Sequence, residues 1–475
     1  MGETLPMNLG ETQVPGSHES SATGFPAANN SHGITVTQEG RTDKKSRRQF
    51  LIAMGASAVT LSTAPSLGAQ ASSSKGLQPL PKLVRIGVVG GGFGAAFQWH
   101  LHPQCQVTAV CDLREDRVQK LKRVYQANTG YKDYREFLKH PDLDAVALFT
   151  PAPSHVNMAV EALKLGKHLI SAVPAAMSVA EVEELLNVVK QTGLKYMMAE
   201  TSRYRQEILT CIDWAREGRF GEILYSEAEY HHTGLAPYAY GSSFDCQTCD
   251  FIRSVDQVNR DAQPAGKLVP TWAHGYPPML YPTHCTGMII PVTGERLTEV
   301  TAHGWGNDHE MLKQNYYNNN PFFHTVALFK TSKGRCARIS IGWHIAAGGT
   351  ERAVFYGDKL SYIMTRPEGS PNTVVEQKPD PKSPFGLYAG LVESRAYDQP
   401  KHFERLPEPL RVASGHGSSH PFITHEFLSA ILEDRQPEVN VWEAIAYTLP
   451  GIIAHQSALA GGTCLKIPDH GKAPA

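Results

Sequence analysis

A chain of 475 residues is too long for one ordinary domain and suits two, since a domain usually holds about 100–200 residues. Its 45 Lys and Arg residues balance 46 Asp and Glu residues, and the net charge of −1 excludes the strongly basic composition typical of nucleic-acid-binding proteins. Hydrophobic residues make up 41% of the chain, which supplies a large core and excludes global disorder. No run of about 18 strongly apolar residues occurs, so we expect a globular protein with no permanent membrane span.

Residues 1–80 are predicted to be a disordered leader with an export signal and a linker. The segment 46–51, with the sequence SRRQFL, precedes a mildly apolar stretch at 52–67, and the sequence AQA at 69–71 matches a cleavage site. Paired arginines before a weakly hydrophobic segment are typical of a twin-arginine signal, which predicts export by the twin-arginine machinery to the periplasm or the medium. A surface helix with two incidental arginines is the alternative, and a start of translation at Met7 stays open.

A dinucleotide-binding domain is predicted for residues 81–200. The short β-branched run at 84–89 has the length of a buried strand and leads directly into a glycine cluster. This cluster contains a G-x-G-x-x-A fingerprint. In it, Gly90 permits a tight turn, Gly92 lets the backbone approach a pyrophosphate, and small Ala95 lets a helix pack on the strand.

The acidic residue expected at the ribose follows the next strand. The run 106–111 ends in Asp112, which lies 22 residues after Gly90 and is placed to bind the adenosine ribose hydroxyls. This spacing favours NAD as the cofactor. NADP stays open as the alternative, because Arg114 nearby can accept a 2′-phosphate.

Helices and strands are predicted to alternate through the rest of this domain. Helical spacing occurs at 114–129, 155–165 and 179–191, and strand-like runs occur at 145–149, 167–172 and 195–199. This order predicts an α/β fold with a parallel, doubly wound sheet and a ligand at the carboxyl ends of its strands. Loops that begin with Thr150-Pro151 and Val173-Pro174 follow two such ends, where a loop can face a nicotinamide.

The pattern changes after residue 200, and a second domain is predicted for residues 201–475. Longer runs, several of them alternating, are expected to form strands at 222–231, 298–303, 325–331 and 335–343. A turn at 332–334 indicates a hairpin between the last two. We therefore expect a large, mainly antiparallel sheet, with closing helices at 422–432 and 442–460.

This order of elements resembles the Gfo/Idh/MocA oxidoreductase family from about residue 84 to residue 469. The most specific stretches are FTPAPSH at 149–155 and GKHLISAVP at 166–174. In the family the second stretch usually ends in Glu-Lys-Pro, with the lysine near the nicotinamide, whereas Val173 stands at that position here. The resemblance implies a Rossmann domain followed by a substrate-binding α/β domain. The missing lysine argues against a simple dehydrogenase that uses it for proton transfer.

Three further stretches resemble the NAD-dependent glycosidase branch of this superfamily, glycoside hydrolase family 109. They are MMAE at 197–200, EAEYHH at 227–232 and YPTH at 281–284, and GHG at 415–417 is a weaker match. The resemblance implies that the candidate catalytic residues lining a sugar site are Tyr230, His232, Tyr281 and His284. It also implies a cofactor site formed by Gly90, Gly92, Phe93, Ala95, Asp112, Thr150, Pro151, His155, Val173 and Pro174.

Tyrosine and histidine suit such a reaction on chemical grounds. Oxidation of a sugar hydroxyl needs a base that takes the O–H proton as hydride leaves. In the redox route to glycoside cleavage, oxidation at C3 acidifies the C2 proton, a second base removes it, the aglycone leaves C1, and water and hydride are then added back. A conventional sugar dehydrogenase or sugar–sugar oxidoreductase is the first alternative. A non-catalytic carbohydrate-binding protein is the second.

Two further features concern metals and assembly. The pair Cys246-x-x-Cys249 is compatible with a disulfide, with half of a zinc site or with no function. Because no second CxxC pair completes a zinc site, we expect no bound metal. An exposed face of the second sheet and the analogy with the family lead us to expect a homo-oligomer.

Overall fold

The computed structural model describes residues 82–232, 240–242, 268–270, 272–306, 312, 317, 320–347, 349–366, 369–378, 382, 384 and 391–474. All of these residues belong to one compact unit. The predicted export signal and the Cys246-x-x-Cys249 pair lie outside the described residues. Within the described part of the chain, no helix has both the length and the apolar composition needed to cross a membrane.

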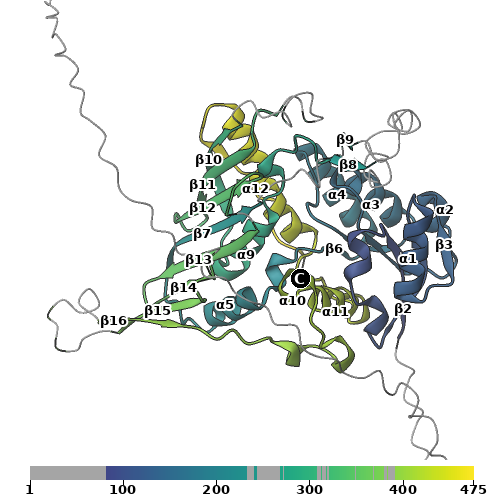
Figure 1. Cartoon of the computed structure of the whole chain (residues 1–475), viewed down its shortest axis with the longest axis horizontal. Helices are drawn as coiled ribbons and strands as arrows, with labels where there is room; N and C mark the ends of the chain where they lie inside the picture. The colour runs from purple at the N-terminus through teal and green to yellow at the C-terminus, as the bar shows by residue number, and fades with distance from the viewer. Residues whose placement is uncertain are drawn as a thin grey trace, which may run out of the picture. The chain divides into compact units, whose positions relative to one another are not determined.

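A six-stranded parallel sheet forms the first part of this unit (Figure 1). The strands run in the order β3-β2-β1-β4-β5-β6, which is the order of a doubly wound dinucleotide-binding sheet. They are β1 (Val84–Val89), β2 (Cys105–Cys111), β3 (Thr129–Tyr131), β4 (Ala145–Leu148), β5 (His168–Ser171) and β6 (Tyr196–Met198). The helices between them are α1 (Glu115–Tyr125), α2 (Tyr134–Leu138), α3 (His155–Lys164) and α4 (Val179–Thr192). The predicted parallel sheet is confirmed.

The helix predicted at 114–129 is shorter in the structure. It ends at Tyr125, because Gln126 adopts a left-handed φ of 55° and strand β3 begins soon after. Left-handed residues at helix ends are usually glycine, so a glutamine gave no stop signal in the sequence.

No α-helix forms in the described residues between β1 and β2, where one was expected after the glycine cluster. Two 3₁₀ segments, Phe93–Ala96 and Trp99–Leu101, take its place. Between them Phe97 adopts an extended conformation and is buried, and Pro103 follows the second segment before β2 begins. Proline lacks the N–H that would continue a helix, so this connection stays short.

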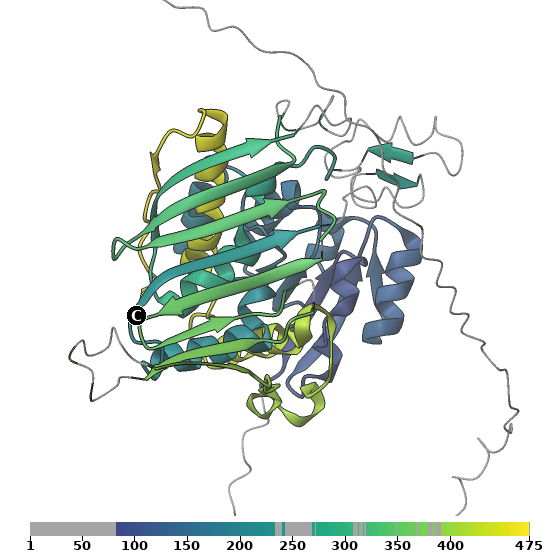
Figure 2. The same cartoon turned by 60° about the vertical axis from the view of Figure 1, so that its left-hand side comes forward.

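A nine-stranded sheet forms the second part, in the order β16-β15-β14-β13-β7-β12-β11-β10-β17. In Figure 2 its strands face the viewer and helices lie behind them. Only the pair β7–β12 is parallel among its described neighbours, which confirms a mainly antiparallel sheet. The strands are β7 (Ile223–His231), β10 (Leu297–Trp305), β11 (His324–Thr331), β12 (Cys336–Gly342), β13 (Thr350–Gly357), β14 (Leu360–Ile363), β15 (Thr373–Lys378), β16 (Leu391–Ala396) and β17 (Leu465–Lys466).

The helices of the second part cover the nine-stranded sheet and reach the first one. They include α5 (Gln206–Arg216), α9 (Thr283–Thr293), α11 (His420–Leu432) and α12 (Val441–Leu459). Helix α9 packs on β7 and β13, while α12 packs on β10 of the second sheet and on α4 and β6 beside the first. Gly451 of α12 lets the segment before α9 approach closely, because a Cβ there would overlap the carbonyl oxygen of Met279. The two sheets are therefore joined by shared helices.

The segment that holds His284 is a helix that the sequence patterns did not predict. His284 lies in the first turn of α9, and nine of the eleven residues of this helix are buried. A helix buried on every side shows no amphipathic period, so its sequence pattern does not reveal it. The predicted domain boundary at 200/201 and the homo-oligomer stay predictions.

Candidate functional site

The glycine cluster turns sharply at the carboxyl end of β1. Gly90 has a φ of 95°, and a Cβ there would overlap the carbonyl oxygen of Phe149 beyond β4. Its N–H donates to the carbonyl of Cys111 at the end of β2, 2.9 Å away. Only glycine tolerates this conformation and this contact together. The turn therefore holds the backbone flat against the ends of three neighbouring strands.

Asp112 lies directly beside this turn. Its Oδ2 accepts a hydrogen bond from the backbone N–H of Gly91 at 2.6 Å, and its Oδ1 accepts one from Arg114 N–H at 2.9 Å. The guanidinium of Arg114 donates to the carboxylate of Asp116 at 2.8 and 2.6 Å. An acid at the end of β2 and a glycine turn at the end of β1 fit the ribose and pyrophosphate of a dinucleotide.

The remaining residues of the predicted fingerprint lie around the same turn. Gly92 faces the guanidinium of Arg117. A Cβ added at Gly92 would lie 2.7 Å from Nη1 of that guanidinium. The ring of Phe93 contacts that of Phe149 at 5.7 Å, and Ala95 is partly buried. A further close approach occurs at Gly94, which the sequence reasoning did not single out and where a Cβ would press on the Phe149 ring.

His155 holds together the two loops that follow β4 and β5. Its Nδ1 lies 2.8 Å from the carbonyl oxygen of Pro174, and its Nε2 lies 2.8 Å from that of Thr150. Burial lowers the pKa of His155, although the carbonyls of Pro174 and Thr150 act in the opposite direction. Pro151 and Val173 are buried in the same loops, and the Val173–Pro174 bond is cis. Contact of these loops with a cofactor stays a prediction.

The four candidate catalytic residues come together in one cluster. Tyr230 is the second-last residue of β7, and His232 follows the end of that strand. Tyr281 precedes α9, and His284 lies in the first turn of this helix. The Tyr230 ring is 4.5 Å from that of His284, 4.8 Å from that of His232 and 6.0 Å from that of Tyr281. The indole of Trp343 packs on Tyr230 and His232 at 6.0 and 5.6 Å.

A buried carboxylate holds His284. Its Nδ1 lies 2.8 Å from Oε1 of Glu200, which is fully buried and follows β6 of the first sheet. The hydroxyl of Ser202 lies 3.1 Å from the same nitrogen. Burial alone would lower the pKa of His284, but the carboxylates of Glu200 and Glu351 raise it above its ordinary value. With a proton on Nδ1, the other ring nitrogen, Nε2, carries the lone pair of a base.

Glu351 completes the charged part of this cluster. It stands opposite Tyr230 in the β13–β7 pairing, accepts from the hydroxyl of Ser202, and pairs with Arg205 at 3.2 Å. Burial would raise the pKa of Glu351, but Arg205 and His284 lower it below its ordinary value. The carboxylate is therefore charged at neutral pH.

Sequence reasoning did not assign Glu200, Ser202, Arg205 or Glu351 to the site. Glu200 could have been found, because it follows the carboxyl end of a predicted parallel strand, where ligands bind. Glu351 could not, since its place depends on the pairing of β13 with β7, which are more than 100 residues apart. The register between two strands that are far apart in the chain cannot be read from the residues of either strand alone.

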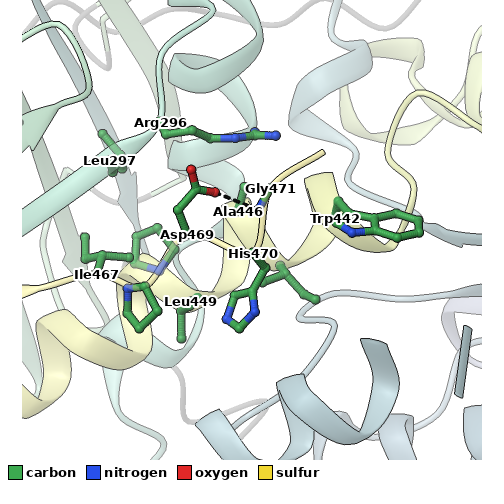
Figure 3. A pocket seen from close by; sticks show the side chains of 12 residues that line it. Arg296, Leu297, Trp442, Ala446, Leu449, Ile467, Asp469, His470 and Gly471 are labelled. Carbon is green, nitrogen blue, oxygen red and sulfur yellow. Dashed lines mark hydrogen bonds between the residues drawn. The ribbon is translucent and has the colours of Figure 1, made fainter. Parts of the chain in front are cut away.

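Other features of the described chain lie apart from this cluster. Figure 3 shows a pocket between α12 and the C-terminal segment, where Asp469 accepts from the N–H of Gly471 at 2.9 Å beneath Arg296. It is lined by none of the candidate residues. Within the described residues, no three His, Cys, Asp or Glu side chains are placed to hold a metal ion.

Comparisons with known proteins agree with this geometry. Residues 84–200 match the oxidoreductase family with an NAD-binding Rossmann fold, GFO_IDH_MocA. An alpha-N-acetylgalactosaminidase of Shewanella oneidensis is 24% identical over 89% of this chain and 95% of its own length. A glycosyl hydrolase family 109 protein of Solibacter usitatus is 25% identical over 90% and 97%. The solved structure of levoglucosan dehydrogenase with NADH and levoglucosan shares the fold, with a TM-score of 0.61 and 16% identity over 82% of this chain and all of that one.

The His284–Glu200 pair predicts a pH-dependent contribution to stability. A histidine whose pKa is raised by folding adds stability that is fully present below its unfolded pKa of about 6.5 and is lost as the pH rises through the folded value. We expect Glu200→Gln to lower the free energy of unfolding by about 3 kcal/mol at about pH 6, and by less at about pH 9. Urea unfolding at both pH values measures this difference.

Exposed Glu184 on α4 supplies the control for this experiment. Glu184→Gln should change the free energy of unfolding little at either pH. If Glu200→Gln lowers the free energy of unfolding equally at both pH values, Glu200 does not stabilise the protonated form of His284.

Proposed function

We propose that this chain, whose residues 84–200 match the Gfo/Idh/MocA oxidoreductase family, is an NAD-containing enzyme that cleaves a glycoside by transient oxidation of the sugar at C3. The observation that carries this proposal is the buried His284–Glu200 pair, which joins the end of the dinucleotide-binding sheet to Tyr230 and Tyr281. The likeness to an alpha-N-acetylgalactosaminidase over 89% of the chain supports cleavage of a glycoside. An α-linked N-acetylhexosamine is therefore the first substrate to test.

The first sheet supplies the cofactor site. The turn at Gly90 and the carboxylate of Asp112 would hold the dinucleotide, and when bound its nicotinamide accepts a hydride from the sugar and later returns it. Val173 stands where the family usually has a lysine and offers no proton. The acid–base work therefore falls to the tyrosine and histidine side chains of the cluster.

His284 suits the removal of the C2 proton. A proton next to a ketone is a weak acid, so its removal needs a comparatively strong base, and the raised pKa of His284 makes Nε2 such a base. Glu200 stabilises the imidazolium that forms, as a buried carboxylate does in other carboxylate–histidine pairs. The rings of Tyr230 and Tyr281 stack on each other at 6.0 Å and lie 4.5 and 5.3 Å from that of His284, so these two tyrosines are the proposed sugar contacts beside the base.

A panel of α- and β-nitrophenyl glycosides tests the reaction. Purified protein without added cofactor should release nitrophenol continuously with no net reduced nicotinamide, because the hydride returns in each cycle. His284→Ala should lower kcat by about 10²–10⁴-fold, as expected for loss of a general base. Deuterium at C2 should slow wild-type turnover and should exchange with solvent.

Two other results would favour the alternatives. Reduced nicotinamide that appears only with free sugar and added NAD would identify a conventional sugar dehydrogenase. Absence of both signals with the whole panel would favour a carbohydrate-binding protein. Unchanged turnover in His284→Ala would remove this residue from the catalytic set while leaving the reaction standing.

We propose NAD rather than NADP as the resident dinucleotide. Asp112 places a negative charge where the 2′-phosphate of NADP would lie, and the Arg114 side chain that could bind this phosphate is paired with Asp116. Mass spectrometry of the nucleotide released from denatured protein should find NAD. Recovery of NADP would contradict this assignment.

We also propose that the protein is exported by the twin-arginine route. The support is the SRRQFL segment at 46–51 with the apolar stretch and the AQA site that follow it. A cofactor that ends each cycle as it began needs no cytoplasmic recycling, which suits an exported enzyme. Replacing Arg47 and Arg48 by lysine should retain the protein in the cytoplasmic fraction, and unchanged fractionation would contradict the proposal.

A further inference from the structure

Ser202 lies between the two carboxylates that surround His284. It begins the 3₁₀ segment Ser202–Tyr204 beyond β6 and has no exposed surface. Its backbone N–H donates to Oε1 of Glu200 at 2.8 Å, and its hydroxyl donates to Oε1 of Glu351. The same hydroxyl oxygen lies 3.1 Å from Nδ1 of His284, while Oε1 of Glu351 lies 4.0 Å from that nitrogen. One serine therefore links both carboxylates to the proposed base.

Arg205 holds the other oxygen of Glu351. Its Nη1 lies 3.2 Å from Oε2 of Glu351, whereas Oε1 accepts from Ser202. Only 13% of the Glu351 side chain and 20% of the Arg205 side chain are exposed, so water competes little for these contacts. The two oxygens of this carboxylate thus have different partners, a cation for one and a hydroxyl for the other.

These contacts determine where the protons lie. A charged carboxylate only accepts, and a serine hydroxyl has one hydrogen, so Ser202 directs that hydrogen to Glu351. Toward His284 the serine oxygen can then only accept, as does Oε1 of Glu200 at 2.8 Å. Both oxygens require the proton on Nδ1, so the neutral ring of His284 keeps its lone pair on Nε2.

We propose, on the basis of the function proposed above, that Ser202 and Glu351 are positioning residues for His284, and that Arg205 orients the Glu351 carboxylate. They keep neutral His284 in the Nδ1–H tautomer, which leaves Nε2 to remove the C2 proton. In that step the C2–H bond breaks, and its electron pair forms a C2=C3 double bond as the ketone becomes an enolate. The proton forms a new N–H bond at Nε2, and the resulting imidazolium donates from Nδ1 to Glu200 and Ser202.

The groups around His284 set the pH at which it becomes a base. Burial lowers the pKa of His284, Glu200 and Glu351 raise it, and Arg205 lowers it. The titratable rings that face it are those of Tyr230, Tyr281, His232 and His416. Because the carboxylates stabilise the imidazolium, removal of the charge of Glu351 should lower the pKa of His284.

Glu351→Gln tests this arrangement while keeping the size of the side chain. Arg205 would attract the amide oxygen, which turns the NH₂ group toward Ser202. The serine hydroxyl would then accept from the amide and be free to donate to Nδ1 of His284, which favours the tautomer with the proton on Nε2.

The measured step is exchange of the C2 proton of a supplied 3-keto glycoside in the holoenzyme. In Glu351→Gln its plateau rate at high pH should fall by about 10–100-fold, with partial recovery in Glu351→Asp. The midpoint of the pH profile should move to lower pH, because the pKa of His284 falls. Formation of reduced nicotinamide from glycoside should stay near the wild-type rate, since it precedes this proton transfer.

Ser202→Ala separates orientation from charge. It removes one acceptor of the Nδ1 proton and keeps both carboxylates, so the plateau should fall by about 3–10-fold while the midpoint moves less. Because Glu351 acts on the tautomer through Ser202, the double variant should show the plateau of Ser202→Ala alone and the lower midpoint of Glu351→Gln. Plateau losses that multiply in the double variant would overturn the link through Ser202.

Glu229 supplies the matched control. Its side chain is 16% exposed, and its carboxylate pairs with Arg338 at 2.8 Å and with Arg352 at 3.0 Å. It precedes Tyr230 on β7, and successive residues of a strand point to opposite faces of the sheet, so it lies on the face away from His284. Glu229→Gln should leave the plateau and the midpoint unchanged.

Nitrogen NMR of histidine-labelled holoenzyme measures the tautomer without turnover. Neutral His284 should carry its proton on Nδ1 in the wild type, and the Nε2–H fraction should rise in Glu351→Gln. An Nε2–H tautomer in the wild type, or a wild-type plateau and midpoint in Glu351→Gln, would overturn the positioning role. If Glu351→Gln does not fold, a wild-type plateau in Ser202→Ala would overturn it instead.

These outcomes distinguish the inference from the function on which it rests. A wild-type protein that cleaves no glycoside would overturn the proposed function. The tautomer of His284 and its shift in Glu351→Gln would then still test the positioning role by NMR alone.

Discussion

One buried hydrogen bond joins the two sheets at the candidate site. Glu200 follows the last strand of the parallel sheet, and His284 lies in the first turn of the helix that packs on the nine-stranded sheet. A carboxylate with no exposure is costly unless it is paired, so the fold must bring a charged or polar partner to it. That requirement fixes the position of α9, and with it Tyr281 and the face of β7 that carries Tyr230. Changes at Glu200 therefore act on fold and chemistry together.

Sequence patterns predicted the elements whose residue types form a recognisable local pattern. The β1 strand and its glycine turn are visible because β-branched residues and a forced positive φ at Gly90 leave clear signatures. Helix α9 left none, because nearly all of its residues are buried and two prolines frame or interrupt it. The candidate residues Tyr230, His232, Tyr281 and His284 came from a family resemblance, and the structure brings all four together.

The partners that set the protonation states were harder to predict than the residues they act on. Glu351 reaches the cluster through the register of β13 against β7, and Ser202, beyond the parallel sheet, donates to its carboxylate. Both contacts join segments more than 100 residues apart. A residue type in a motif can be recognised locally, but the pKa of its side chain depends on neighbours that only the folded chain supplies.

Val173 stands where the family usually has a lysine. In the proposed reaction, other side chains must therefore carry the protons, and their pKa values depend on the neighbouring charges. In the proposed reaction, a lysine beside the nicotinamide would provide one group for the proton transfers, whereas the cluster offers two histidines, His284 and His232, in opposite environments. Carboxylates raise the pKa of His284, whereas partial burial is the main cause that lowers the pKa of His232. Pairs of groups whose pKa values are pushed apart are suited to different steps of one reaction. A reaction that must remove one proton from oxygen and another from carbon requires such a difference between its two bases.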